Sequence, residues 1–208
     1  MFAYAAPAHH KRLDAARLLE RARAGEVLIH LPATCITEAR PAILMKCQPR
    51  NEADAIRQFL LRAQKEGTVP IEREVAAREV LDQFDKQVLG ELKEVPNILK
   101  ALRTEPGLDL FALNEKMLDR AIALAEADLA LEPFDQAILA AVLGRAEELR
   151  AEGQTDLCFC EIDGHLQPWD KRGRPKDLLM KLYVEALVWV YNDFEMNTPP
   201  RPENWPTV

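Results

Sequence analysis

Apolar residues recur at helical spacing through most of the chain. Between residues 10 and 24 they fall at positions i, i+3, i+4 and i+7, which predicts an amphipathic helix ending at Gly25. The same spacing predicts further amphipathic helices from an Asn51 cap to Gly67, over residues 71–94 and over residues 114–131. The predicted buried stripes are Ala15, Leu18, Leu19 and Ala22; Ile56, Phe59, Leu60 and Ala63; Ala77, Val80, Leu81, Phe84 and Val88; and Leu118, Ala121, Ile122 and Ala125.

A different pattern begins at Pro133, a residue that suits the first position of a helix. The following stretch FDQAILAAVLG is apolar nearly all round, so this helix should lie in a core, while its charged continuation GRAEELRAEG should be exposed. Residues 177–185 also have a helical pattern. Short apolar runs at 27–31, 156–162 and 186–191 have the length of buried strands.

The order of these elements is helix, strand, several helices, strand, helix, strand. Such alternation predicts a layered α/β fold with a short parallel sheet. The stretch 67–115 reads as a helical insertion or flank that adds no strand, so residues 1–208 are predicted to form a single domain. A final segment, 197–208, is rich in proline and is predicted to be an irregular tail.

Composition describes an ordinary soluble globule, with 48% hydrophobic and 29% charged residues among 208. The net charge of −7 and the pI near 5.3 exclude a global cationic field, so any nucleic-acid contact must be local or assisted by metal ions. No apolar run approaches the roughly 20 residues of a membrane helix, and no signal peptide is visible. The four cysteines read as small buried thiols, which indicates a reducing cytoplasm.

Three acids stand beside segments predicted to be buried. Glu38 follows the strand at 27–31, Asp135 is in the first turn of the buried helix, and Asp163 closes the strand at 156–162. Because ligands sit beyond the carboxyl ends of parallel strands, all three are expected at one end of a sheet. Clustered carboxylates repel one another unless a hard cation such as Mg²⁺ or Mn²⁺ compensates them. Singly, each acid also fits a helix N-terminus or, in Asp-Gly, a turn.

In their order and context these segments resemble the PIN-domain family of metal-dependent nucleases. The stretch EVLIHLPATCITEA carries Glu38, FDQAILAAVL carries Asp135, and LCFCEIDGHLQP carries Asp163; the resemblance covers about half the chain, 1–48 and 130–193. It implies a three-layer PIN-like α/β fold with Glu38, Asp135 and Asp163 as catalytic metal ligands for Mg²⁺ or Mn²⁺. Water would be the nucleophile and RNA the substrate. Many members are cytoplasmic toxins that form homodimers and are held by an antitoxin protein.

The sequence departs from the family pattern in two places. Family members begin with a strand that ends in a metal-binding Asp, and this motif should end just where Met1 stands. It is expected either to be encoded upstream or to have been lost. The interval from Asp135 to Asp163 is also longer than in the family, so Glu161 and Asp170 stay open as alternative ligands.

The loop after the third acid carries the basic residues Lys171, Arg172 and Arg174. They are candidate phosphate-binding residues, and a solvated loop is the alternative. Trp169 in this loop either stacks on a base or packs over the loop, and His165 either assists proton transfer or lies on the surface. The competing function is a catalytically impaired module that binds nucleic acid or protein and does not cleave.

Overall fold

Helices make up most of the computed structural model, which describes residues 2–127, 129, 131–162, 164–203 and 205. The chain divides into two units. The first unit is Met1–Leu13 with Ile36–Glu105, and the second is Asp14–Cys35 with Pro106–Val208. Four short strands, all in the second unit, form two parallel pairs in the described part of the chain. The mixed α/β class predicted from the sequence is therefore confirmed, and the described part of the chain is mostly helical.

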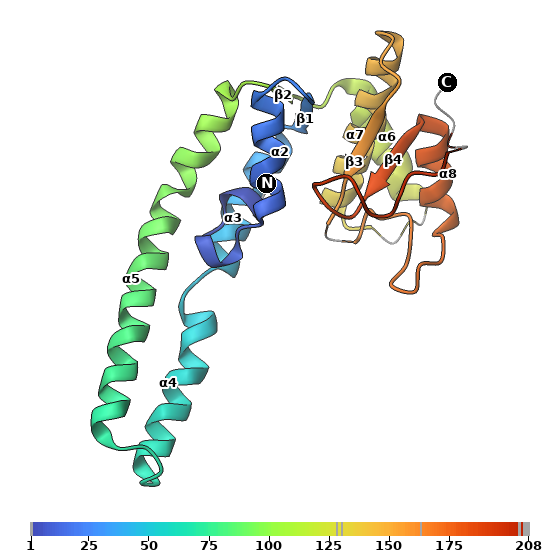
Figure 1. Cartoon of the computed structure of the whole chain (residues 1–208). Coiled ribbons are helices and arrows are strands. Elements are labelled where there is room, and N and C mark those ends of the chain that lie inside the picture. The colour runs from blue at the N-terminus through green and yellow to red at the C-terminus, as the bar shows by residue number, and fades with distance from the viewer. Residues whose placement is uncertain (1, 128, 130, 163, 204, 206–208) are drawn as a thin grey trace. The chain divides into compact units, whose positions relative to one another are not determined.

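The first unit is built around a long helical hairpin. Helices α4 and α5 run side by side in opposite directions and are joined at Gly67, whose φ of 71° suits a residue without a side chain (Figure 1). The elements of this unit are α1 (Phe2–Ala5), the 3₁₀ turn η1 (Ala8–His10), most of α3 (Thr34–Lys46), α4 (Arg50–Lys65), α5 (Ile71–Ala101) and the 3₁₀ turn η2 (Leu102–Thr104).

Helix α5 extends beyond its predicted end at residue 94 and passes through Pro96 to Ala101. Proline removes one backbone hydrogen bond, but the apolar stripe continues past it. Val88, Leu92, Val95 and Leu99 are all buried on the same side of the helix. Their burial outweighs the lost hydrogen bond, and the predicted end of the helix at residue 94 is wrong.

The start and the buried face of α4 also differ from the prediction. Pro49 holds the N-cap position, and Asn51 instead donates from Nδ2 to the Met45 and Lys46 carbonyls at 3.2 and 3.1 Å. Asn51 thus satisfies the end of α3 rather than the start of α4.

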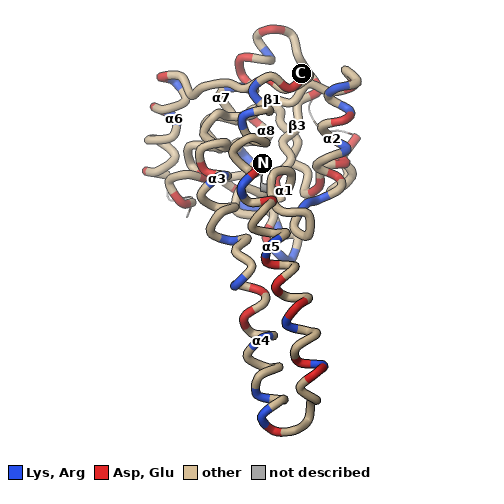
Figure 2. The backbone as a smooth tube through the Cα atoms, turned by 90° about the vertical axis from the view of Figure 1, so that its left-hand side faces the viewer, with Lys and Arg blue, Asp and Glu red and all other residues tan. Residues whose placement is uncertain are grey.

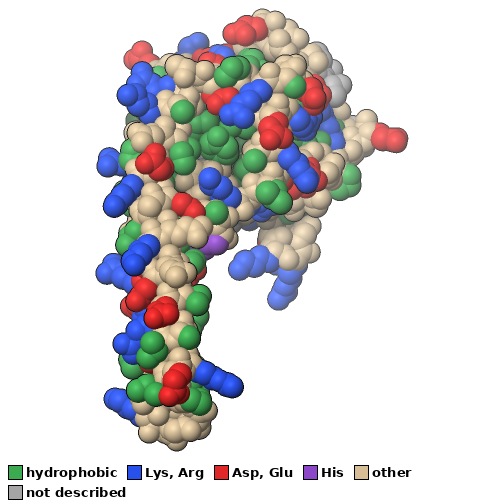
Figure 3. Space-filling view, turned by 60° about the vertical axis from the view of Figure 1, so that its left-hand side comes forward, with side chains coloured by type: hydrophobic (Ala, Val, Ile, Leu, Met, Phe, Trp, Pro, Cys, Tyr) green, Lys and Arg blue, Asp and Glu red, His purple; other side chains and the backbone are tan. Residues whose placement is uncertain are grey.

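The side of α4 that is buried is lined by small residues. Ala53 and Ala63 are buried, whereas Ile56 and Phe59 from the predicted stripe are 50% and 60% exposed. A helix that packs on a single neighbour covers only a narrow strip, and alanines allow the closest approach. Apolar side chains consequently remain on the surface of the hairpin, as Figure 3 shows.

The second unit holds the strands and the largest core. Its elements are α2 (Leu13–Arg23, whose first residue ends the first unit), β1 (Ile29–Pro32), the first two residues of α3, β2 (Leu108–Phe111), α6 (Glu115–Glu126), α7 (Pro133–Ala151), β3 (Leu157–Cys160), α8 (Asp177–Ala186) and β4 (Val188–Tyr191). The predicted buried positions Ala15, Leu19 and Ala22 of α2 are confirmed.

The strands pair in parallel but in two separate sheets. Ile29 of β1 pairs with Leu108 of β2, and Leu157 of β3 pairs with Val188 of β4. The prediction that 67–115 adds no strand is wrong, because β2 lies in it; four residues that include an Asp give too weak a signal. The run at 27–31 overlaps β1 and the run at 156–162 contains β3, and the described residues place these strands in different sheets rather than in one.

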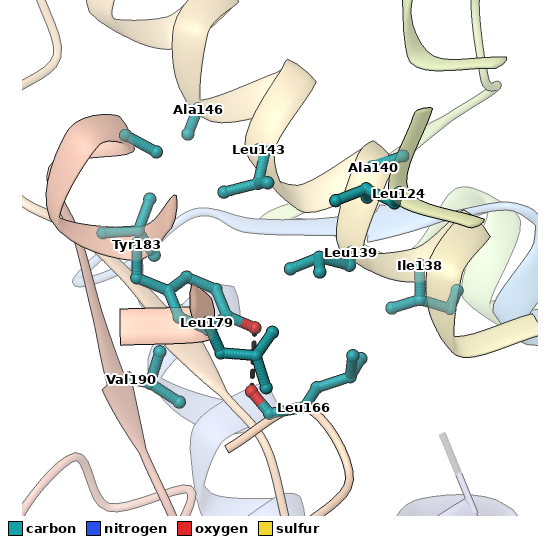
Figure 4. Close-up of a cluster of buried hydrophobic side chains, with 12 residues drawn as sticks. Leu124, Ile138, Leu139, Ala140, Leu143, Ala146, Leu166, Leu179, Tyr183 and Val190 are labelled. Atoms are coloured by element: carbon teal, nitrogen blue, oxygen red, sulfur yellow. Dashed lines mark hydrogen bonds between the residues drawn. The ribbon is translucent and has the colours of Figure 1, made fainter. Parts of the chain in front are cut away.

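The core of the second unit forms around α7, which is buried as predicted. Leu139, Ala140 and Ala141 are completely buried. Figure 4 shows α7 facing side chains of α8 and β4, with the Tyr183 hydroxyl donating to the Leu166 carbonyl at 2.9 Å. The cluster comprises Leu124, Ile138, Leu139, Ala140, Leu143, Ala146, Leu166, Leu179, Tyr183, Ala186, Val188 and Val190.

Helix α6 packs on α7 through a face one position away from the predicted one. Met117 is buried, whereas Leu118 is 51% exposed. The cause is Gly144 on α7, where an added Cβ would lie 2.6 Å from the Met117 Cγ. Because Gly144 has no side chain, Met117 fits against it. The face of α6 that carries Met117 therefore packs on α7, and Leu118 lies at the surface.

Among the residues that the structure describes, no helix is both long and apolar enough to cross a bilayer. In the segment from 197 onward, the described residues form no helix or strand. This segment packs through Trp189, whose Nε1 donates to the Pro199 carbonyl at 3.0 Å.

Candidate metal and substrate site

The first turn of α7 meets the loop that follows β3. Pro133 begins the helix, and Asp135 lies in its first turn, where a carboxylate is favoured by the helix dipole. His165 Nδ1 lies 3.3 Å from Asp135 Oδ2 and shares a hydrogen bond with it. The Asp135 side chain is 22% exposed and that of His165 is 61% exposed, so the pair is open to solvent on the histidine side.

The loop after β3 is held in place by hydrogen bonds of its own. Glu161 Oε1 accepts from the Gly164 N–H at 3.3 Å, and Gly164 has a φ of 87° that closes the turn. Lys176 Nζ donates to the Gly164 and His165 carbonyls at 2.9 and 3.2 Å. The backbone on the C-terminal side of residue 163 is therefore fixed beside Asp135.

The structure describes two of the three predicted metal ligands. Asp135 lies in the first turn of α7 beside His165, and Asp163 lies outside the described residues. Glu38 is the fifth residue of α3, is exposed, and belongs to the first unit, whereas Asp135 belongs to the second. The convergence of Glu38, Asp135 and Asp163 stays a prediction.

The alternative ligand Asp170 is occupied by its own loop. Its Oδ1 accepts from the Arg172 and Arg174 N–H groups at 2.8 and 2.9 Å, and its Oδ2 accepts from Arg174 Nε at 2.7 Å. The Arg174 backbone N–H and then its guanidinium lower the pKa of Asp170, so this carboxylate stays charged. Asp170 organises the turn that it starts.

The predicted basic residues all lie in this turn, and all three are exposed. The Arg174 guanidinium is paired with Asp170, so Lys171 and Arg172 are the better candidates for phosphate binding. Trp169 packs edge-on against Trp189 with ring centroids 5.2 Å apart and contacts the core. Packing over the loop, rather than base stacking, is its observed role.

A polar network on the other end of α7 was not predicted. His30 of β1 and Asp109 of β2 are cross-strand partners, and His30 Nδ1 lies 2.8 Å from Asp109 Oδ2. Arg145 of α7 donates to the same oxygen at 2.8 Å and to Glu148 at 2.9 Å. Burial pushes the pKa of Asp109 up, but the His30 hydrogen bond and the Arg145 charge bring it below its ordinary value. Arg145 stands in the charged continuation GRAEELRAEG, which was predicted to be exposed, so nothing in the sequence marked it as part of a network.

Among the described residues, three or more potential metal-ligand groups come within 4.8 Å of one another only at His9, His10 and Glu52, in the first unit. Neither Glu161 nor Asp170 forms such a group with Asp135 and His165 in the part of the chain that is described. Comparison of the chain with models of known families, with curated proteins and with solved structures gave no match.

Proposed function

We propose that this chain is a PIN-like ribonuclease that hydrolyses RNA phosphodiester bonds with Mg²⁺ or Mn²⁺. The contact between Asp135 and His165 carries the proposal. The resemblance assigns metal binding to Asp135 and to Asp163, and His165 lies two residues beyond the latter. Two ligands on these segments require the first turn of α7 and the loop after β3 to be neighbours, and the contact supports this.

In the proposed site Glu38, Asp135 and Asp163 hold the ion within a three-layer PIN-like fold. When bound, the ion supplies the charge that neutralises the carboxylates and activates a water for in-line attack. His165, beside Asp135, is suited to exchange a proton with that water. Lys171 and Arg172 bind the phosphates of the RNA. With a net charge of −7 the protein relies on these local charges to attract RNA.

By the same resemblance we propose a cytoplasmic toxin that acts as a homodimer and is inhibited by an antitoxin protein. An antitoxin could inhibit by covering the Asp135–His165 pair, because the pair is open on the histidine side. Gel filtration of the purified chain with light scattering tests the dimer, and recovery of a small co-encoded protein that abolishes cleavage tests the antitoxin.

The direct test is cleavage of a fluorescently labelled RNA in Mn²⁺ by the wild type, Asp135→Asn and Asp177→Asn. Asp177 is the matched control, because it also lies in the first turn of a helix, α8, and is exposed. Changes to groups around metal ligands cost about 10–100-fold, so loss of a ligand should cost at least about 100-fold. Asp177→Asn should cleave like the wild type, and EDTA should abolish all cleavage.

Equal cleavage by Asp135→Asn and the wild type, or cleavage that survives EDTA, would exclude the proposed chemistry. His165→Asn should leave RNA binding intact and slow cleavage. RNA binding by fluorescence anisotropy without cleavage in any metal would favour the alternative, a catalytically impaired PIN-like module that binds nucleic acid or protein.

A further inference from the structure

Two histidines and a glutamate converge on one point of the first unit. His9 and His10 are on η1, and Glu52 is in the first turn of α4. His10 Nε2 and His9 Nε2 lie 2.8 and 3.3 Å from the same atom, Glu52 Oε1. The three ligand atoms are within 4.8 Å of one another. Each imidazole thus directs its Nε2 atom at the same carboxylate oxygen.

The backbone that carries the histidines is fixed at both ends. Pro7 is buried, and its carbonyl accepts from the His10 and Lys11 N–H groups at 2.8 and 3.1 Å, which closes the 3₁₀ turn. The Ala8 N–H donates to Glu91 Oε2 on α5 at 2.6 Å. The position of the two imidazoles is therefore set by α5 as well as by the turn.

The rings themselves are supported by aromatic contacts. The His9 and His10 rings lie with centroids 4.3 Å apart, and the His9 ring meets the Phe84 ring edge-on at 5.2 Å. The side chains are still 29%, 36% and 41% exposed for His9, His10 and Glu52, so an ion from solvent can reach the ligand atoms. The group is preorganised and accessible, which are the two properties that a binding site needs.

We propose that His9, His10 and Glu52 bind a divalent transition-metal ion, with Zn²⁺ as the metal that fits best. Imidazole nitrogens suit Zn²⁺, Ni²⁺ and Cu²⁺, whereas Mg²⁺ prefers oxygen ligands and keeps its waters. Three protein ligands leave the fourth tetrahedral position of Zn²⁺ to water. The site therefore differs from the Mg²⁺ or Mn²⁺ site of the proposed nuclease in both location and chemistry.

The observed distances are close to those of a loaded site. Zinc bonds of about 2.1 Å in a tetrahedron place neighbouring ligand atoms about 3.4 Å apart. The two nitrogen–oxygen distances, 2.8 and 3.3 Å, approach this value, so small rotations of the side chains admit the ion. Cys47 does not compete as a ligand: burial first, and the charge of Glu52 second, raise the pKa of its thiol.

Bound metal would tie the N-terminal segment to the hairpin. Without metal, η1 is joined to α4 through Glu52 and to α5 through Glu91 and Phe84. A metal ion would bind both Nε2 atoms and Glu52 Oε1, release to solvent any proton that these nitrogens carry, and so fix η1 on α4. The amides of His10 and Lys11, which close the turn, should exchange more slowly when Zn²⁺ is present.

The test titrates Zn²⁺ into the full chain by calorimetry and Co²⁺ by visible absorption. We expect one equivalent of either metal to bind, and His10→Asn and Glu52→Gln each to weaken binding by at least about 100-fold. Circular dichroism in EDTA checks that both variants keep the wild-type fold. Because the side chains are exposed, no loss of fold is expected.

Two controls identify the ligands. Cys158 is exposed and Cys160 is partly exposed, so this pair of thiols is an alternative soft site, and Cys158→Ser/Cys160→Ser must still bind Zn²⁺. Asp135→Asn must also bind it, and Glu52→Gln must keep any Mn²⁺-dependent RNA cleavage; the two proposals can thus fail separately. Binding that survives in His10→Asn and Glu52→Gln, or that disappears with the thiols, would overturn the site.

Discussion

Helices α7 and α5 show two ways in which one chain stabilises a helix. In the 19 residues of α7 the buried side chains occupy most of the circumference between Ile138 and Leu149. In the 31 residues of α5 they form one stripe, which is concentrated between Val88 and Leu99. Helix α7 is stabilised by apolar burial on most of its faces. Helix α5 is stabilised by apolar burial on one face, mainly in its C-terminal half.

Where α5 has little apolar burial, charged pairs join it to α4. Arg57 of α4 donates to Asp85 at 2.6 Å and lies 3.2 Å from Asp82, both on α5. Figure 2 shows basic and acidic residues along both helices. Arg57 and Asp85 are partly buried and Asp82 is exposed, and ion pairs that solvent can reach contribute little to stability, so the end of the hairpin near Gly67 should open far more easily than the α7 core.

The largest expected effect comes from emptying the α7 core. Leu139 is completely buried, and Leu139→Ala should lower the free energy of unfolding of the second unit by about 4 kcal/mol, from lost burial and the remaining cavity. Leu118→Ala, at a residue that is 51% exposed, should change it by less than about 0.5 kcal/mol. All three tryptophans belong to the second unit, so their fluorescence during urea unfolding reports this difference. Equal effects would show that α7 does not organise the core.

A smaller effect is expected where the chain enters β2. Gly107 has a φ of 74°, and a Cβ there would lie 2.1 Å from the Ala22 carbonyl oxygen. Gly107→Ala must therefore displace backbone in addition to adopting an unfavourable φ, and should cost about 2–4 kcal/mol. Gly25 has nearly the same φ, 76°, but nothing within 4 Å.

Gly25→Ala accordingly isolates the cost of the backbone angle, about 1–2 kcal/mol. Both variants are measured by urea unfolding of the second unit. If both variants lower the free energy of unfolding by the same amount, the contact of Gly107 with Ala22 of α2 adds nothing to the cost of the substitution. That contact would then not hold β2 in place.

The sequence predicted α7 best because its pattern left no choice of face. A helix that is apolar all round must be buried wherever its neighbours lie. In α4 and α6 the pattern showed amphipathic helices but not which side would be covered. That side depends on small residues elsewhere, such as Gly144, which makes room for Met117. The exposure of Ile56 and Phe59 was not predicted for the same reason.

Tertiary contacts also explain what was missed in the sites. The first turn of α7 was correctly predicted to carry Asp135, because Pro133 and the apolar run mark the helix start. Its contact with His165 depends on how the β3 loop folds back, which spacing along the chain does not encode. The group of His9, His10 and Glu52 spans more than 40 positions and is created by the packing of η1 on the hairpin.

The smallest expected effect tests the hairpin directly. Arg57→Gln removes a charge that three aspartates share, including Asp54 at 3.4 Å, and should speed amide hydrogen exchange in α4 and the facing turns of α5 by about twofold to fivefold at low salt. Arg62→Gln is the matched control on α4, because Arg62 is exposed and donates to the Gln58 carbonyl. The difference between the two variants should shrink in high salt, which screens exposed charges. An effect as large as that of Leu139→Ala would mean that ion pairs hold the hairpin as firmly as burial holds α7. No difference would mean that the narrow strip around Ala53 and Ala63 is sufficient by itself.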